Sequence, residues 1–202
     1  IFSSVADGML EARGTAVGNT PGAANGVSNS SAGSSLSLHG DNLSGNDVWK
    51  LNVGEWYGGS DGNFGMTLGI MVFQIPNFGN VANPFLTAGM EVTLAQKGDS
   101  LDFPADLWAV RASVSDDLLL SDWFIGPEMG APGDGAAGTL IQQSYLTPSS
   151  EVGQILTSNS GNDALLDYLN ARYDNGNGVG DYVFFRINKG DEDAFAYGWN
   201  AY

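Results

Sequence analysis

The apolar positions of this chain concentrate in two runs separated by a loop between two prolines. In Leu68–Ile75, apolar residues occupy both alternating faces, which is typical of a strand buried on both sides. In Ala88–Ala95, apolar and polar residues alternate with period two, so one face is expected to pack on a core. Pro76 and Pro84 cannot donate to a sheet ladder and delimit the loop. We predict that these two strands form the centre of an antiparallel sandwich.

Similar patterns predict the remaining elements. Further strands are expected over Asp47–Tyr57, Ala105–Val114, Thr139–Leu146 and Tyr182–Asn188, with one more near Ile1–Ala12. Either the aromatic tail Phe195–Tyr202 forms a last strand, or that strand is missing or supplied by another subunit. Asn162–Tyr173 is the best helix candidate, because Leu165, Leu166 and Leu169 fall on one face. Asn162 or Asp163 is expected to cap this helix and Gly176 to end it. The predicted core comprises Val72, Phe73, Val92, Trp108, Val110, Phe185 and Ile187.

The fold class predicted from this order is all-β: a jelly-roll-like antiparallel β-sandwich with one short helix in its C-terminal half. Residues 38–202 are long enough to bury one core, so we predict a single domain there. Residues 1–37 form a separate arm rich in glycine, serine and asparagine. The 29 glycines of the chain fit a loop-rich β protein better than a helical one.

The charge balance excludes several classes of partner. The formal net charge is −16, with only 7 lysine and arginine residues, which argues against binding a nucleic-acid backbone or an anionic lipid surface. No apolar run is long enough to span a bilayer. Cysteine is absent, which excludes disulfides and thiolate metal sites, and the chain starts at Ile1 instead of methionine. We predict a processed protein that is secreted or held at the cell surface.

The N-terminal arm is the candidate assembly element. A segment so poor in apolar residues buries too little surface to offset the entropy of ordering, so contacts with another copy of the chain are expected to hold it. Backbone pairing along a sheet edge needs hydrogen bonds instead of large side chains. The predicted assembly residues are Ile1, Phe2, Val5, Met9 and Leu10.

Two other kinds of site are weighed against structural roles. Aromatic side chains at Trp56, Tyr57 and Trp199 are candidates for stacking on sugar rings, although tryptophans more often fill a core. Oxygen-bearing side chains in two acidic turns are candidate calcium ligands, although solvated turns have the same composition. These predicted ligands are Asp174, Asn177, Asp181, Asp191 and Asp193. Calcium is the cofactor considered.

Catalytic chemistry has little support in the sequence. His39 is the single histidine and no G-x-S-x-G motif accompanies it, so a serine hydrolase is not indicated. Paired carboxylates of a glycosidase type are expected by chance among 23 acidic residues. We predict that the protein is not an enzyme.

The order of the segments resembles a known family of domains. MVFQIP (71–76) and TAGMEVTL (87–94) are followed by DLWAVRASVS (106–115), LSDWF (120–124) and LLDYLNARYDNGNGVGDYVFFRI (165–187). This order is similar to secreted β-sandwich domains of the DNRLRE or disaggregatase-related type, which occur in bacterial proteins with a PEP-type sorting tail. The resemblance covers Val48–Ile187. It implies a jelly-roll sandwich and, more loosely, a carbohydrate-binding or structural role.

Three functions therefore stay open at the level of sequence. The preferred one is a non-catalytic extracellular structural protein that assembles with its own copies into a fibre, sheath or surface layer. The alternative is an extracellular carbohydrate-binding module, and the third is a glycan-active enzyme. The ordered arm favours the first, whereas the family resemblance favours the second.

Overall fold

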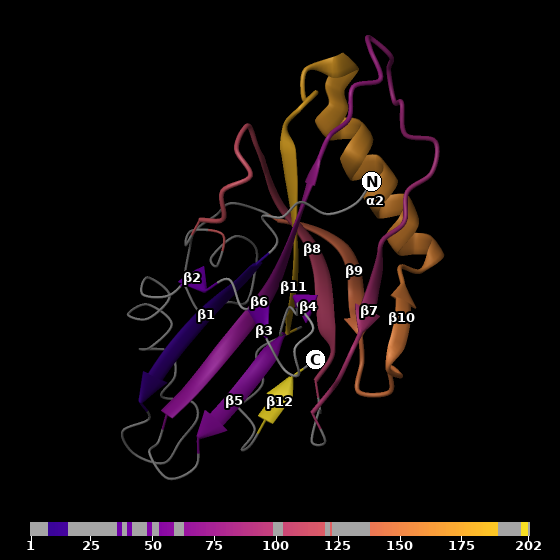
Figure 1. The fold of residues 1–202 in the computed structure, drawn as a ribbon. Helices are drawn as coiled ribbons and strands as arrows, with labels where there is room; N and C mark the ends of the chain where they lie inside the picture. The colour runs from indigo at the N-terminus through magenta and orange to yellow at the C-terminus, as the bar shows by residue number, and fades with distance from the viewer. Residues whose placement is uncertain are drawn as a thin grey trace.

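Antiparallel strands make up most of the regular secondary structure that the computed structural model of this chain describes (Figure 1). The structure describes residues 8–15, 36–37, 40–41, 48–49, 53–58, 63–98, 103–119, 122, 138–189 and 199–201. The chain is thus mainly β, with one α-helix within these ranges.

The largest sheet has eight strands and runs in the order β12-β5-β6-β11-β8-β9, with β1 and β2 attached beside β6. Its strands are β1 (Gly8–Thr15), β2 (Leu36–Ser37), β5 (Gly54–Gly58), β6 (Asn63–Gln74), β8 (Ala105–Ser113), β9 (Thr139–Leu146), β11 (Tyr182–Lys189) and β12 (Trp199–Ala201). All of its ladders are antiparallel.

The long strand β6 joins two parts of this sheet. Its first residues, Asn63–Thr67, pair with both β1 and β5, whereas Gly69 and Ile70 pair with both β1 and β11. A strand residue has one ladder partner on each side, so β5 and β11 must share one edge of β6 while β1 occupies the other. Figure 1 shows β1, β5 and β12 gathered around the first half of β6, away from the helix.

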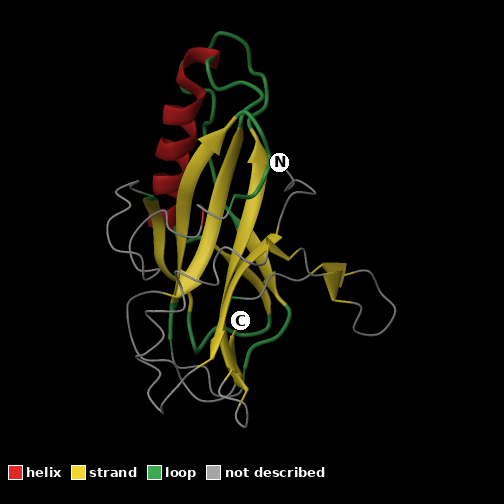
Figure 2. Ribbon diagram, turned by 90° about the vertical axis from the view of Figure 1, so that its left-hand side faces the viewer, coloured by secondary structure: helices red, strands yellow, loops and turns green. Residues whose placement is uncertain are grey.

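Two small sheets and a helix complete the described fold. β7 (Glu91–Leu94) pairs with β10 (Gly153–Leu156), and β3 (Gly40–Asp41) pairs with β4 (Val48–Trp49). The helix α2 (Asn159–Tyr173) is followed by the single 3-10 turn η3 (Asp174–Gly176). Figure 2 shows α2 standing alongside the long strands.

The main core lies between one face of the large sheet and a layer made of α2 and the β7–β10 pair. β6, β8 and β11 contribute alternate residues to it, as expected for strands with a buried face. The buried members from these strands are Met71, Ala105, Leu107, Ala109, Val183, Phe185 and Ile187. Ile141 and Tyr145 of β9 belong to the same sheet and the same core. Leu94 from β7 and Leu165, Tyr168 and Tyr173 from α2 close the core from the other side.

The opposite face of the sheet is buried as well. Leu68, Ile70, Val72 and Phe184 have no exposed surface, and Trp108 and Val110 are buried beside them. Burial on both faces confirms the two-sided pattern predicted for Leu68–Ile75. Of the seven predicted core residues, five are buried, while Phe73 and Val92 are half-buried and pack against the core cluster.

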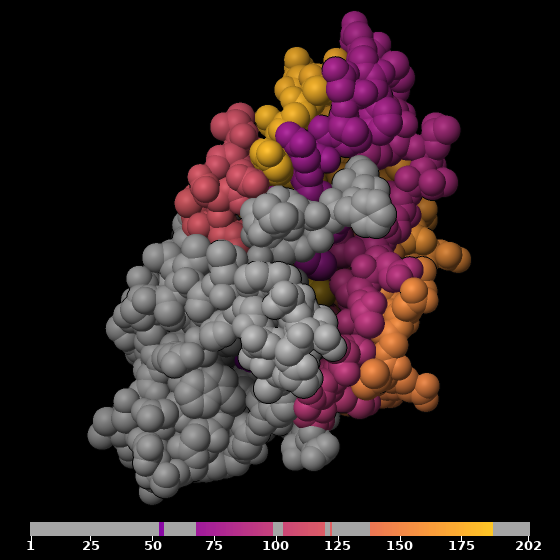
Figure 3. Space-filling model, in the orientation of Figure 1, coloured from indigo at the N-terminus to yellow at the C-terminus, as the bar shows by residue number. Residues whose placement is uncertain are grey.

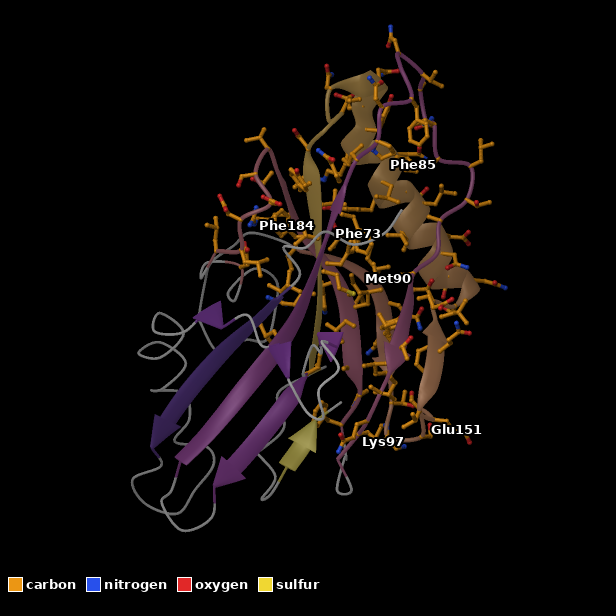
Figure 4. All side chains as sticks on the ribbon, viewed as in Figure 1. Phe73, Phe85, Met90, Lys97, Glu151 and Phe184 are labelled. Atoms are coloured by element: carbon orange, nitrogen blue, oxygen red, sulfur yellow. The ribbon has the colours of Figure 1, made fainter. Side chains whose placement is uncertain are left out.

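Long-range hydrogen bonds tie the smaller layer to the sheet. The Tyr145 hydroxyl on β9 donates to the carbonyl of Ile155 on β10 at 3.0 Å. Lys97, which follows β7, donates from Nζ to the carbonyls of Pro148 and Ser150 at 2.8 and 2.7 Å. The β7–β10 pair is thereby bonded to β9 through Tyr145 and to the connection that follows β9 through Lys97, which Figure 4 shows near Glu151 of that connection.

The helix follows its predicted position with different caps. It begins at Asn159, because the hydroxyl of Ser158 accepts a hydrogen bond from the Gly161 amide, so the prediction of Asn162 or Asp163 as cap is wrong. It ends at Asp174, whose φ of 38° is left-handed, before the predicted Gly176. Leu165 is buried as predicted, while Leu166 and Leu169 are half-buried because Tyr168 and Tyr173 take the deeper positions.

Three other expectations need correction. The predicted central pair does not form: β6 lies in the large sheet, but β7 pairs with β10, because the intervening loop crosses to the helix layer. The strand predicted over Asp47–Tyr57 is divided into β4 and β5. The strand predicted over Ala105–Val114 is interrupted by a β-bulge opposite Phe184 and Phe185. The bulge leaves Val110 without a ladder partner on β11, so Arg111 lies opposite Phe184 and the regular period of two is broken there.

Candidate functional site

The candidate assembly site is the edge of β6 that β1 covers. All residues of β1 pair with β6, from Gly8 opposite Ile70 to Thr15 opposite Asn63. On its other side, β1 is paired at Met9 and Leu10 with Ser37 and Leu36 of β2. Residues 8–15 of the arm predicted over residues 1–37 therefore add a strand to the sheet of their own chain.

The predicted assembly residues divide between described and masked parts of the chain. Met9 and Leu10 lie in β1, opposite Gly69 and Leu68. Ile1, Phe2 and Val5 lie outside the described residues. On the acceptor strand, Leu68 and Ile70 have no exposed surface, so β6 is deeply enclosed where β1 begins.

The candidate sugar-binding residues lie at the end of the large sheet. Trp199 of β12 is the ladder partner of Trp56 of β5, and Tyr57 is the partner of Phe64 of β6. Residues directly opposite one another on antiparallel strands are close neighbours on a sheet. The fold thus places two of the three predicted positions directly opposite each other, from segments far apart in the sequence.

Three of the five predicted calcium ligands, Asp174, Asn177 and Asp181, lie in the segment that follows α2. Asp174 caps the helix, and its carboxylate accepts a hydrogen bond from Asn177 Nδ2 at 3.1 Å. The Asp181 amide donates to the carbonyl of Gly178 at 3.1 Å. Asp191 and Asp193 lie outside the described residues, and within the described ranges no three histidine or acidic side chains are grouped to hold a metal. Calcium therefore stays a prediction.

A buried ion cluster on the second face of the sheet escaped sequence reasoning. Arg111 on β8 donates from Nε and Nη2 to the two carboxylate oxygens of Asp122, the second bond measuring 2.9 Å. Arg186 on β11 donates from Nη1 to the Asp122 carbonyl at 3.0 Å, and both Arg186 and Asp122 have no exposed surface. The Leu119 amide donates to the same carboxylate at 2.9 Å.

The Arg111–Asp122 contact at the centre of this cluster is a hydrogen-bonded ion pair, as expected for charges that are largely buried. The cluster joins two strands of the sheet to the described residues 114–119 and 122, which belong to no ladder. One feature of the sequence could have indicated this cluster: Arg111 and Arg186, two of only 7 basic residues, lie inside apolar strands. Strand periodicity placed Arg186 beside Phe184 but could not show that the face was buried.

The loop from Ile75 to Met90 is held against α2 by two side chains. The Asn170 amide accepts from the Phe85 amide and donates to the Phe85 carbonyl, both at 3.0 Å. The Tyr173 hydroxyl accepts from the Phe78 amide at 2.9 Å and donates to the Gly79 carbonyl. Figure 4 shows Phe85 lying beside the helix. The loop that sequence analysis treated as a connector is therefore a fixed part of the fold.

The remaining sequence candidate, His39, lies outside the described residues. Within the described ranges, no helix is both long and apolar enough to cross a bilayer. No protein-family model matches the chain, and no curated protein sequence matches it significantly.

Proposed function

We propose that this protein is a non-catalytic extracellular structural protein whose copies assemble into a fibre, sheath or surface layer by exchanging β1. The proposal takes the chain to be a jelly-roll-like β-sandwich in which β1 can leave β6, which also breaks its two-residue pairing with β2. One observation carries it: the full-length ladder between β1 and β6 within one chain.

A strand held through its backbone can be replaced by the same strand from another copy. The β1–β6 contact consists of ladder pairs, and the identical ladder would form in trans at the same edge. Residues 16–35, which connect β1 to β2, contain only small, polar and aliphatic residues and no charge. A flexible chain of that many residues has an end-to-end distance on the order of 25 Å, so the length of the connection permits β1 to reach a neighbour.

Protein concentration is expected to decide whether β1 pairs with β6 of its own chain or with β6 of another copy. A covalent connection of this length holds its own β1 at an effective concentration on the order of millimolar, so a dilute chain is expected to keep β1 in cis. Exchange becomes competitive when copies are crowded at a surface. If each copy gives β1 to the next, the contact does not close on itself and propagates as a filament. The charge of −16 opposes close approach, so added salt is expected to favour assembly.

The test uses a chain whose β1 cannot leave. Because the protein has no cysteine, Glu11→Cys with Thr67→Cys, and separately Ala12→Cys with Met66→Cys, would each join one pair of ladder partners. One of the two adjacent pairs is of the closer, non-hydrogen-bonded type. At high concentration in salt, the oxidised double-cysteine protein should form no long assemblies, whereas the reduced form should. Sedimentation and electron microscopy measure the length of the assemblies. Equal assembly of both forms would overturn strand exchange.

Carbohydrate binding is the second candidate, and the pairing of Trp199 with Trp56 favours it. Neighbouring tryptophans on a sheet offer the flat surface on which sugar rings stack. Retention on insoluble polysaccharides should fall in both Trp56→Ala and Trp199→Ala, and by a similar amount, if the pair acts as one platform. Retention that is unaffected by either substitution would leave assembly as the sole proposal.

A further inference from the structure

The turn that follows α2 contains two Asn–Gly pairs in succession, Asn175–Gly176 and Asn177–Gly178. Figures 1 and 3 place this turn at one end of the molecule, beside the loop Ile75–Met90. An asparagine before glycine can lose its side-chain ammonia spontaneously, because glycine has no side chain to hinder attack by its own amide nitrogen. The structure treats the two neighbouring pairs differently.

The second pair is held at both of its reacting groups. The Asn177 side-chain amide donates to the Asp174 carboxylate at 3.1 Å. Gly178 is buried, and its backbone amide donates to the Tyr173 carbonyl at 3.3 Å. A Cβ at Gly178 would overlap the carbonyl oxygen of Arg172, so this part of the backbone packs directly on the end of the helix. Attack by the Gly178 nitrogen therefore requires that the helix end be opened first.

The first pair is exposed and less firmly held. The Asn175 side chain is exposed and forms no hydrogen bond with another described residue. Its φ of 55° and ψ of 32° are left-handed, whereas Asn177 has the ordinary right-handed values of −64° and −32°. Gly176 lies in the single 3-10 turn η3, in which hydrogen-bond geometry is poorer than in an α-helix. Rotation of the Asn175 backbone out of this turn also relieves its left-handed strain.

We propose that Asn175 deamidates spontaneously in the folded chain, whereas Asn177 is protected. The Gly176 nitrogen gives its proton to hydroxide and attacks the Asn175 Cγ. The new N–Cγ bond closes a five-membered succinimide, and the Cγ–Nδ2 bond breaks, so that the amide nitrogen takes up a proton and leaves as ammonia. Water then opens the ring, giving aspartate if it breaks the N–Cγ bond and isoaspartate if it breaks the original peptide bond.

The reaction would change the end of the helix. It replaces a neutral amide by a carboxylate beside Asp174, at the C-terminal end of α2, where the helix dipole disfavours negative charge. Isoaspartate also adds one carbon to the backbone of η3. A Cβ at Gly176 would lie 3.3 Å from the carbonyl oxygen of Gly79, so the altered turn lies against the loop Ile75–Met90. The proposal needs no enzyme and does not depend on the exchange of β1.

The first experiment compares the two asparagines in the same peptide. Trypsin cleaves after Arg172 and Arg186, which leaves both Asn–Gly pairs in residues 173–186. Protein is incubated in mildly alkaline buffer, either folded or in urea, and tandem mass spectrometry assigns the gain in mass to one asparagine or the other. In the folded chain, Asn175 should react at least about tenfold faster than Asn177. In urea the two rates should agree within about threefold, because the protection is lost.

Several results would overturn the proposal. Equal rates in the folded chain, or a faster reaction at Asn177, would show that the turn does not select Asn175. The same ratio in urea as in buffer would assign the difference to sequence alone. A folded chain that stays unchanged while the urea sample is converted would show that both pairs are protected. Aspartate without isoaspartate, as measured with an isoaspartate-specific methyltransferase, would exclude the succinimide route.

A matched pair of variants gives a second readout by intact mass. Asn25→Gln removes the third Asn–Gly pair of the chain and serves as the background. Glutamine would have to close a six-membered ring and reacts more slowly, so Asn175→Gln should abolish most of the gain in mass, whereas Asn177→Gln should preserve it. Equal gains in the two variants would contradict the proposal. Both side chains are exposed, and the comparison within the parent chain stands even if a variant fails to fold.

Discussion

The guanidinium carbon of Arg111 lies 3.6 Å from the centre of the Phe184 ring, while its nitrogens bind both carboxylate oxygens of Asp122. The bulge in β8 makes this arrangement possible, because it puts Arg111 opposite Phe184. One arginine thereby links an apolar sheet face to a buried carboxylate.

Removal of that carboxylate should destabilise the fold strongly. Asp122→Ala leaves Arg111 without its partner in a largely buried site and should lower the free energy of unfolding by about 3–5 kcal/mol. Asp117→Ala is the control, since that exposed side chain binds only the Ser115 hydroxyl among described partners and should cost less than about 1 kcal/mol. Urea unfolding measures both. Similar losses would show that the buried pair contributes no more than a surface contact.

Asn170→Ala should loosen the contact between the Ile75–Met90 loop and α2, where the Tyr173 hydroxyl keeps its own hydrogen bonds. Loss of the two hydrogen bonds with the Phe85 backbone should cost about 1–3 kcal/mol, since the amide and carbonyl of Phe85 then lack their partner. Hydrogen exchange at the Phe85 amide should accelerate more than exchange in β11. Asn159→Ala, at the exposed start of the helix, is the control and should leave hydrogen exchange in the Ile75–Met90 loop unchanged.

The stability of the protein should fall in alkaline solution. Burial raises the pKa of the Tyr145 hydroxyl and that of Tyr168 above the ordinary value of about 10. Above pH 10 the unfolded chain ionises these groups while the folded chain keeps them neutral, so the unfolded state binds fewer protons and stability decreases as pH rises. Each tyrosine contributes up to about 1.4 kcal/mol per pH unit.

The corresponding variants separate this effect from general alkaline unfolding. Tyr145→Phe and Tyr168→Phe should each give a shallower decline of the urea midpoint between pH 9 and pH 11, although each loses a hydrogen bond at neutral pH. Slopes identical to that of the parent chain would mean that these hydroxyls do not titrate differently in the folded and unfolded states.

Calcium binding around the end of α2 has a direct thermal test. A cation that binds only the folded chain adds about 2.7 kcal/mol at a concentration of one hundred times its dissociation constant. Millimolar calcium should therefore raise the melting temperature relative to chelator, and Asp174→Asn should reduce the rise. Asp163→Asn, on the exposed side of α2, is the charge-matched control. Superimposable melting curves in calcium and chelator would end the prediction.

Local patterns in the sequence were sufficient to locate most elements. β9 coincides with its predicted range, and β6, β11 and α2 contain theirs almost entirely, because periods of 2 and 3.6 express which side chains must be buried on one element. The alternation in β11 also separated Val183, Phe185 and Ile187, which face the main core, from Phe184 and Arg186.

Only the tertiary structure decided which elements become neighbours and which polar groups are buried. The partner of β7, the three partners of β6 and the β8 bulge depend on pairing between residues far apart in the chain. The enclosure of Arg186 and Asp122 depends on which segments cover the second face of the sheet. A linear pattern records the preference of each residue for its own element, whereas ladder partners and buried ion pairs are chosen by the packing of several elements at once.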